Sequence, residues 1–271
     1  TMPNIFSYQS AEVDWCEGNF ERSTVIAEYY NTVTAFRRCD GTTLFSLLLL
    51  TPLNFLVLEG AAAWQVKHGT MLSLLLAGIF SVYFHMTLSY VGQLLDELSI
   101  LWTLAAAYSF WYPRVHFPRC IKSRKHFFWL TGVTTVISTL MSFIKPAFNA
   151  YVLNCIAFHL LYLIWRELKK CNDKRVHWTA AAMVVCWVLA ISSWISDRWL
   201  CGLWQAINFP YFHSFWHILI AISLLYCCPL VIYFDVKYEM PSFKPKLGYW
   251  PSDSWPVVVP YIALEESHKQ C

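Results

Sequence analysis

Seven long apolar stretches constrain this chain more than any other feature. They lie near residues 43–63, 70–90, 93–112, 127–144, 148–166, 178–197 and 210–234. A helix needs about 20 mostly apolar residues to cross a hydrocarbon core of about 30 Å. Only 14% of the 271 residues are charged, whereas a soluble globular protein has about 25%. We therefore predict an all-α, polytopic membrane protein, built as a seven-transmembrane-helix bundle.

The basic residues of the short loops predict the orientation, because cytoplasmic loops carry an excess of Lys and Arg. The loops after the third and fifth stretches are basic; they contain Arg114, Arg119, Lys122, Arg124, Lys125, Lys169, Lys170, Lys174 and Arg175. This places the N-terminus on the lumenal side and the C-terminus in the cytosol. We expect three parts: a lumenal segment at 1–42, a transmembrane domain at 43–235 and a cytosolic tail at 236–271.

The first stretch is the least regular of the seven. Arg37, Arg38 and Asp40 precede it, and Pro52 interrupts it. Either its helix starts after these charges, or the segment comes from an unusual transcript, and the sequence leaves the start of the helix open. The net charge of +3 is too balanced for a nucleic-acid-binding surface, so we expect the lipid bilayer as the main partner, with no nucleic acid and no obligate protein partner evident.

Three histidines are predicted to lie at one depth near the lumenal side. His213 and His217 are four residues apart and therefore project from one face of a helix. Such a pair alone more often consists of interfacial histidines bonded to water or to carbonyls. The up-and-down topology adds His85 at the same depth. Three neutral imidazoles with one open position are the ligands of a catalytic zinc ion, so we predict a Zn²⁺ site.

Several polar residues near this cluster have more than one interpretation. Ser81 lies one helical turn before His85 and either faces the site or bonds its own backbone. Asp96 either orients a histidine, accepts a proton from water, or is a boundary charge. Asp197 either orients a zinc histidine or pairs with Arg198, and both alternatives stay open.

The N-terminal segment gathers oxygen donors on the same side, at Asp14, Glu17, Asn19 and Glu28. Calcium takes six to eight hard oxygen ligands, so a Ca²⁺ site is one interpretation. A solvated acidic surface is the other, and it is the commoner arrangement. Most of the ten cysteines lie in apolar runs, where a thiol behaves as a small hydrophobic group.

Three segments together resemble a known family. They are DWCEGNFERSTVIAEYYNT at 14–32, SVYFHMTLSYVGQLLDEL at 81–98 and YFHSFWHIL at 211–219. This combination is similar to the alkaline ceramidases, which belong to the superfamily of the adiponectin and progestin receptors. The segment SWISDRWLC at 193–201 looks closest to the type 1 group of that family.

The resemblance implies a zinc-dependent intramembrane amidase that hydrolyses ceramide to sphingosine and a fatty acid in the endoplasmic reticulum membrane. It implies zinc ligands at His85, His213 and His217, and catalytic groups at Ser81 and Asp96. It also implies a supporting calcium site formed by Asp14, Trp15, Glu17, Asn19 and Glu28, and a disulfide between Cys16 and Cys201. The alternative is a seven-helix lipid receptor that uses zinc structurally.

One departure from the family pattern concerns the first helix. After Asn31 and Thr32 the family continues directly into an apolar helix, whereas this chain inserts Arg37, Arg38 and Asp40. The exact geometry between Glu28 and the histidines is therefore left open.

Overall fold

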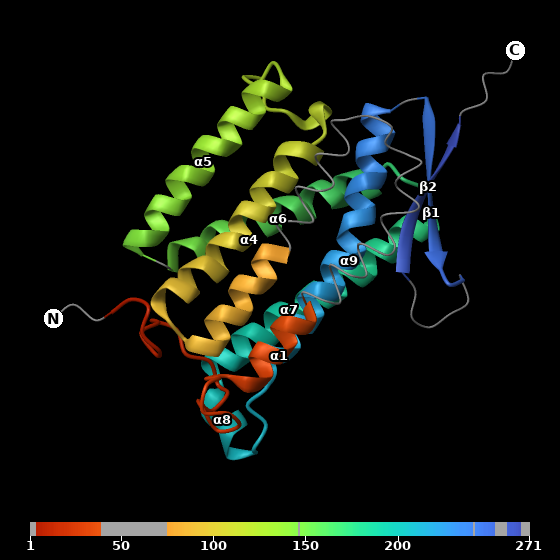
Figure 1. Ribbon diagram of the computed structural model, residues 1–271. Coiled ribbons are helices and arrows are strands. Elements are labelled where there is room, and N and C mark those ends of the chain that lie inside the picture. The colour runs from red at the N-terminus through yellow and green to blue at the C-terminus, as the bar shows by residue number, and fades with distance from the viewer. Residues whose placement is uncertain (1–3, 39–74, 146, 241, 253–258, 267–271) are drawn as a thin grey trace, which may run out of the picture.

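The computed structural model describes residues 4–38, 75–145, 147–240, 242–252 and 259–266, and helices dominate them (Figure 1). The elements are α1 (Tyr29–Arg38), a helix at Leu75–Thr87 (the 75–87 helix), α4 (Tyr90–Trp111), the short 3-10 helix η2 (Arg114–His116), α5 (Arg124–Ile144), α6 (Ala147–Leu168), α7 (Lys174–Trp199), α8 (Cys201–Ala206), α9 (Phe212–Glu239), and the strands β1 (Phe243–Trp250) and β2 (Val259–Glu266).

Four helices are long and apolar enough to cross a membrane, namely α5, α6, α7 and α9. They match the stretches predicted at 127–144, 148–166, 178–197 and 210–234. Exposed apolar side chains such as Trp129 on α5 suit contact with lipid. The helical, membrane-type fold is therefore confirmed, but the count of seven spans is not. The stretch predicted at 43–63 lies outside the described residues, and the 75–87 helix and α4 are not among the four.

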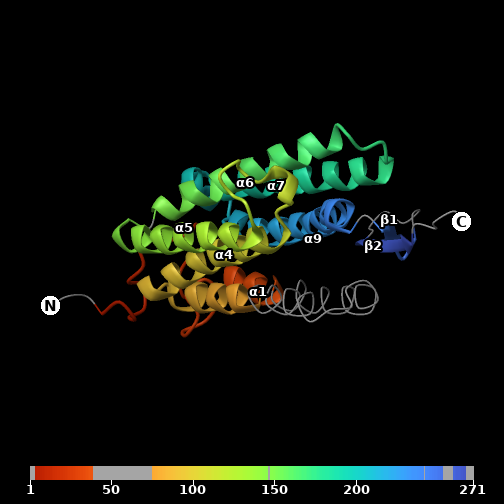
Figure 2. The same cartoon turned by 90° about the horizontal axis from the view of Figure 1, so that it is seen from above.

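The helices form layers along a common direction. In Figure 2, α6 and α7 lie on one side of α4 and α9, and α1 lies on the other. Among the described elements, α7 and α9 form the most extensive contact. Their shared core includes Val176 and Ala180 from α7 and Leu230 and Phe234 from α9. These apolar side chains hold the two longest helices in a fixed register.

The C-terminal part contains a β-hairpin, which the all-α prediction did not include. Strands β1 and β2 pair antiparallel with Leu247 opposite Ile262. Both side chains are buried and join the core of α7 and α9. The Tyr249 hydroxyl also donates to the Arg175 carbonyl at 2.8 Å. The hairpin is thus packed onto the end of the bundle.

Helix α1 lies within the segment that precedes the first apolar stretch. It begins at Tyr29 and already contains Arg37 and Arg38. The Glu17 carboxylate accepts the backbone amides of Tyr30 and Asn31 at 2.6 and 2.9 Å. A carboxylate is stabilising at a helix N-terminus, because it bonds free amides and complements the helix dipole. Asp40 and Pro52 lie outside the described residues.

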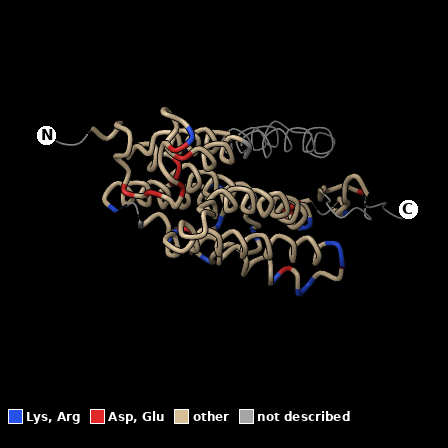
Figure 3. Tube along the Cα trace, turned by 90° about the horizontal axis from the view of Figure 1, so that it is seen from below, with Lys and Arg blue, Asp and Glu red and all other residues tan. Residues whose placement is uncertain are grey.

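Acidic residues gather at one end of the bundle, and a basic loop lies at the other. Figure 3 shows acidic residues gathered near the N-terminal segment. The basic loop of residues 114–125 lies between α4 and α5, where α9 ends, because Glu239 of α9 pairs with Arg114 and Arg124. With 28 residues, α9 spans about 42 Å between the ends.

Candidate metal centre

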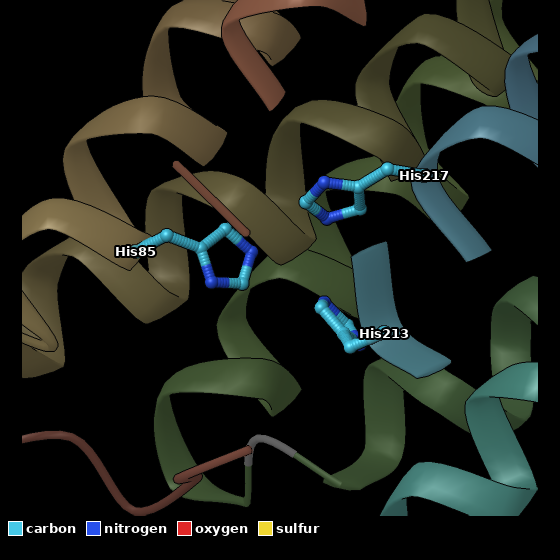
Figure 4. Close-up of side chains that lie close together, drawn as sticks. All are labelled: His85, His213 and His217. Carbon is cyan, nitrogen blue, oxygen red and sulfur yellow. The ribbon is translucent and has the colours of Figure 1, made fainter. Parts of the chain in front are cut away.

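The three predicted histidines converge in space. His85 comes from the 75–87 helix, and His213 and His217 come from the first turns of α9. Figure 4 shows their rings turned toward one another. One ring nitrogen from each lies within 4.8 Å of the others, and the residues are only 0–3% exposed. Neutral imidazoles gathered this closely in a buried place are suited to binding a transition metal.

Two neighbours determine which ring nitrogens face this cluster. The Glu28 carboxylate lies 2.5 Å from Nδ1 of His85. The Thr34 hydroxyl lies 3.2 Å from Nδ1 of His217 and can donate its own hydrogen to the Tyr30 carbonyl at 2.8 Å, which leaves its oxygen able to accept from the histidine. These contacts occupy Nδ1 of His85 and Nδ1 of His217, so in these two rings Nε2 is the nitrogen that can face the centre. Nε2 of His85 is buried and has no hydrogen-bond partner among the described residues, as a metal-ligating atom would.

The N-terminal segment is held against the end of the 75–87 helix by its backbone. The last carbonyls of a helix have no partner within it. Here the carbonyls of His85, Met86 and Thr87, and that of Leu88 just after the helix, accept the backbone amides of Glu28, Ala27, Gln9 and Ala11 in that order, at 2.9–3.1 Å. This pairing places the Glu28 side chain beside His85. The relationship left open by the sequence is thus set by backbone hydrogen bonds.

The partners of Asp197 differ from both interpretations of the sequence. Its carboxylate accepts the backbone amide of Cys16 at 3.0 Å and that of His213 at 3.1 Å. It bonds the backbone of a zinc-candidate histidine rather than its ring, and no salt bridge to Arg198 is formed within the described residues. Arg198 instead donates to the Asp14 carbonyl at 3.4 Å. Asp197 therefore joins the N-terminal segment to the start of α9.

Two further contacts strengthen this junction. Cys16 and Cys201 form a disulfide, which links the N-terminal segment to α8. The Trp15 ring stacks on the His213 ring, with centroids 3.7 Å apart and planes inclined by 21°. The segment thus covers His213 and restricts its movement.

The two proposed catalytic side chains lie on neighbouring helices. Ser81 is fully buried, and its hydroxyl has no hydrogen-bond partner among the described residues. The alternative of a bond to its own backbone is therefore not observed. Asp96 is 9% exposed in the second turn of α4. Only Leu88 and Ser89 separate α4 from the 75–87 helix. The last turns of the 75–87 helix and the first turns of α4 therefore lie at the same end of the bundle.

The predicted calcium ligands lie in one N-terminal loop, where they hydrogen-bond within the chain. The side-chain amide of Asn19 donates to the Asp14 carboxylate at 3.0 Å, and the backbone amide of Trp15 donates to the Glu28 carboxylate at 3.1 Å. Burial raises the pKa of Asp14 and of Glu17, and the nearby Glu28 charge raises both further. A bound cation would relieve this repulsion between carboxylates. Among the described residues, only the histidines form a compact metal-ligand group.

Sequence reasoning missed a buried network between α1 and α9. The Ser214 hydroxyl donates to the side-chain oxygen of Asn31 at 2.6 Å, and the side-chain amide nitrogen of Asn31 donates to the Glu28 carboxylate at 3.1 Å. Thr34, one turn after Asn31, reaches His217. The signal in the sequence is the spacing of Asn31 and Thr34, which places two polar side chains on one face of α1.

Comparisons with known proteins identify the family of this chain. The family model described as Ceramidase matches residues 7–263. The chain is 46% identical to alkaline ceramidase 1 of Mus musculus, with 100% of this chain and 97% of the relative covered. It is 44% identical to alkaline ceramidase 1 of Homo sapiens, with both chains fully covered. It is 38% identical to alkaline ceramidase of Drosophila melanogaster, covering 96% of this chain and 90% of the relative. A family-model match across almost the whole chain and these identities show that the chain belongs to the alkaline ceramidase family.

Proposed function

We propose that this chain is a zinc-dependent intramembrane amidase that hydrolyses ceramide to sphingosine and a free fatty acid. The observation that carries the proposal is the buried group of His85, His213 and His217, with Glu28 on the far side of the His85 ring. The similarity to alkaline ceramidases supports ceramide as the substrate. Membrane-type helices suit a substrate with two long apolar chains.

The donor set fits zinc. Three neutral histidines with an open fourth position are typical of catalytic zinc sites. When bound, zinc would polarise the substrate carbonyl and lower the pKa of a water molecule to about 7. Glu28 and Thr34 would hold the rings of His85 and His217 in the tautomers that present Nε2.

The remaining chemistry is assigned to two side chains. The Ser81 hydroxyl donates a hydrogen bond to the carbonyl oxygen of the amide as negative charge develops there. Asp96 accepts the proton of the attacking water and returns it to the nitrogen that leaves. The water oxygen joins the acyl carbon, the carbon–nitrogen bond breaks, and the products are a fatty acid and an amine.

The same proposal includes calcium and location. Calcium bound by Asp14, Trp15, Glu17, Asn19 and Glu28 would order the N-terminal segment, with Trp15 contributing its backbone carbonyl. Glu28 would then belong to both metal sites, since it also contacts His85. The protein would reside in the endoplasmic reticulum membrane with its N-terminus lumenal and its C-terminus cytosolic.

Purified protein in detergent tests this function directly. The wild-type chain should release sphingosine from ceramide, and a zinc chelator should abolish the release until zinc is restored. His217→Ala should be inactive, while His159→Ala is a matched control because His159 contacts Tyr108 on α4. Folded, zinc-loaded wild-type protein that releases no sphingosine would reject the amidase and favour a receptor. An active, folded His217→Ala variant would reject the zinc mechanism.

A further inference from the structure

We propose that a basic pocket far from the histidines binds the phosphorylated headgroup of an anionic membrane lipid. The pocket lies between η2 and the start of α5 and encloses about 530 Å³. Its lining includes five basic residues and no acidic residue: Arg114, Arg119, Lys122, Arg124 and Lys125. We call these residues and the space between them the basic pocket.

Two of the arginines are held in place by the protein. Glu239 at the end of α9 pairs with Arg114 at 3.2 Å and with Arg124 at 3.3 Å. Arg124 also donates to the Tyr112 carbonyl at 2.6 Å and lies over the Phe117 ring. These contacts order one wall of the pocket before any ligand arrives, which lowers the entropic cost of binding.

The other three basic side chains are accessible to a ligand. Arg119, Lys122 and Lys125 are exposed, and none forms a salt bridge within the part of the chain that the structure describes. A single carboxylate, Glu239, is shared by the two ordered arginines. The pocket thus keeps an excess of positive charge, which favours a multiply charged anion.

A comparison with the second basic loop shows that loop orientation alone does not explain this arrangement. Positive charge on cytoplasmic loops is general in membrane proteins. In the second loop, however, Lys170 pairs with Glu167 at 3.1 Å and Lys169 lies 3.7 Å from the centre of the Trp165 ring. Arg175 donates to the Leu247 carbonyl. Lys169, Lys170 and Arg175 are thus engaged within the protein, whereas Arg119, Lys122 and Lys125 form no salt bridge among the described residues.

The position of the pocket favours a lipid as the occupant. Helix α5 is long and apolar enough to cross the membrane, and it begins at Arg124. The pocket therefore lies at the depth where headgroups meet the hydrocarbon core. In the proposed orientation this is the cytosolic leaflet, which carries the anionic lipids. A headgroup with a phosphomonoester brings more negative charge than a zwitterionic headgroup, so it is the better match.

The test uses the full purified chain and fluorescent short-chain phosphatidylinositol 4-phosphate. We expect saturable binding that weakens with salt, and no binding of the matched phosphatidylcholine probe. The variant Arg119→Gln/Lys122→Gln/Lys125→Gln should bind about 100-fold more weakly, given about 1 kcal/mol for each basic residue near the surface. The control Lys169→Gln/Lys170→Gln/Lys174→Gln removes the same charge from the second loop and should bind like wild type.

Each other result contradicts the proposal. Equal losses in the two variants would indicate a general charge effect rather than a site, and unchanged binding in the first variant would exclude this pocket. Inorganic phosphate that displaces the probe at equal concentration would mean that the site takes free phosphate and not a lipid. Thermal unfolding of both variants, measured beside wild type, identifies a loss caused by misfolding, and a conservative Arg119→Lys/Lys122→Arg/Lys125→Arg variant should restore binding.

Discussion

Glu28 and His85 form a fully buried pair, with the carboxylate 2.5 Å from Nδ1 of the ring. Both residues are 0% exposed. A carboxylate behind a metal-ligating histidine fixes the tautomer and increases the basicity of the other nitrogen. The pair also joins the N-terminal segment to the 75–87 helix. It is therefore the point at which the two proposed metal sites are connected.

Replacement of Glu28 should weaken zinc binding. Glu28→Ala removes the partner of His85 Nδ1, and loss of such a partner typically costs 10- to 100-fold in metal affinity or activity. Zinc affinity measured against a competing chelator, and sphingosine release, should both fall. Glu28→Gln keeps an oxygen that accepts the Nδ1 hydrogen and should retain more zinc affinity. Equal affinity in wild type and Glu28→Ala would contradict the positioning role, and an unchanged calcium response would contradict the link to calcium.

Thr34 should act on His217 as Glu28 acts on His85. Thr34→Val has a similar shape but cannot accept the Nδ1 hydrogen, so we expect about 10-fold or greater loss of zinc affinity. Thr34→Ser keeps the hydroxyl and should restore affinity. Thr134→Val is the matched control, because Thr134 on α5 makes the same bonds to carbonyls three and four residues earlier. If Thr34→Val and Thr134→Val bind zinc equally well, the contact has no role in metal binding.

Loss of the Ser81 hydroxyl should affect turnover but not metal content. Ser81→Ala should lower kcat at least 100-fold, the usual cost of removing one oxyanion donor. Its zinc content should remain that of wild type. Ser142→Ala serves as the control, since Ser142 is an equally buried helical serine that bonds the Ser138 carbonyl. Normal turnover in Ser81→Ala would remove this residue from the mechanism.

Calcium affinity should rise with pH and depend on Asp14. Burial and the neighbouring Glu28 raise the pKa of the Asp14 carboxyl, and only the ionised carboxylate is a calcium ligand. Protonation should therefore release calcium at a higher pH than an ordinary aspartate would. Asp14→Asn should need more calcium for full activity and keep its zinc. A calcium response that is identical in both proteins at every pH would count against the site.

Sequence reasoning captured the elements governed by hydrophobic length and helical spacing. The pair His213 and His217 shares a face by spacing alone, and topology brings His85 to the same depth. Contacts made through the backbone could not be predicted in this way. The Glu28 amide bonds the His85 carbonyl, and Asp197 bonds the amides of Cys16 and His213. Such pairings depend on where chain segments meet in space, which no local pattern encodes.

The hairpin was missed, and the start of the first helix was left open, for a different reason. The tail after residue 236 is short and interrupted by Pro and charged residues, so it gave no membrane signal. In the structure Leu247 and Ile262 lie opposite each other on the hairpin, and both side chains pack against the helical core. Helix α1 begins at Tyr29 because Glu17 bonds its first amides. That carboxylate is 12 residues before the helix and outside any capping pattern.

X-ray absorption spectroscopy at the zinc edge of active, purified protein tests the central claim most directly. The account predicts one zinc ion per chain with imidazole nitrogens at about 2.0–2.1 Å, and fewer imidazole ligands in His85→Ala, His213→Ala and His217→Ala. A first shell that contains cysteine sulfur at about 2.3 Å, or active protein without zinc, would contradict it.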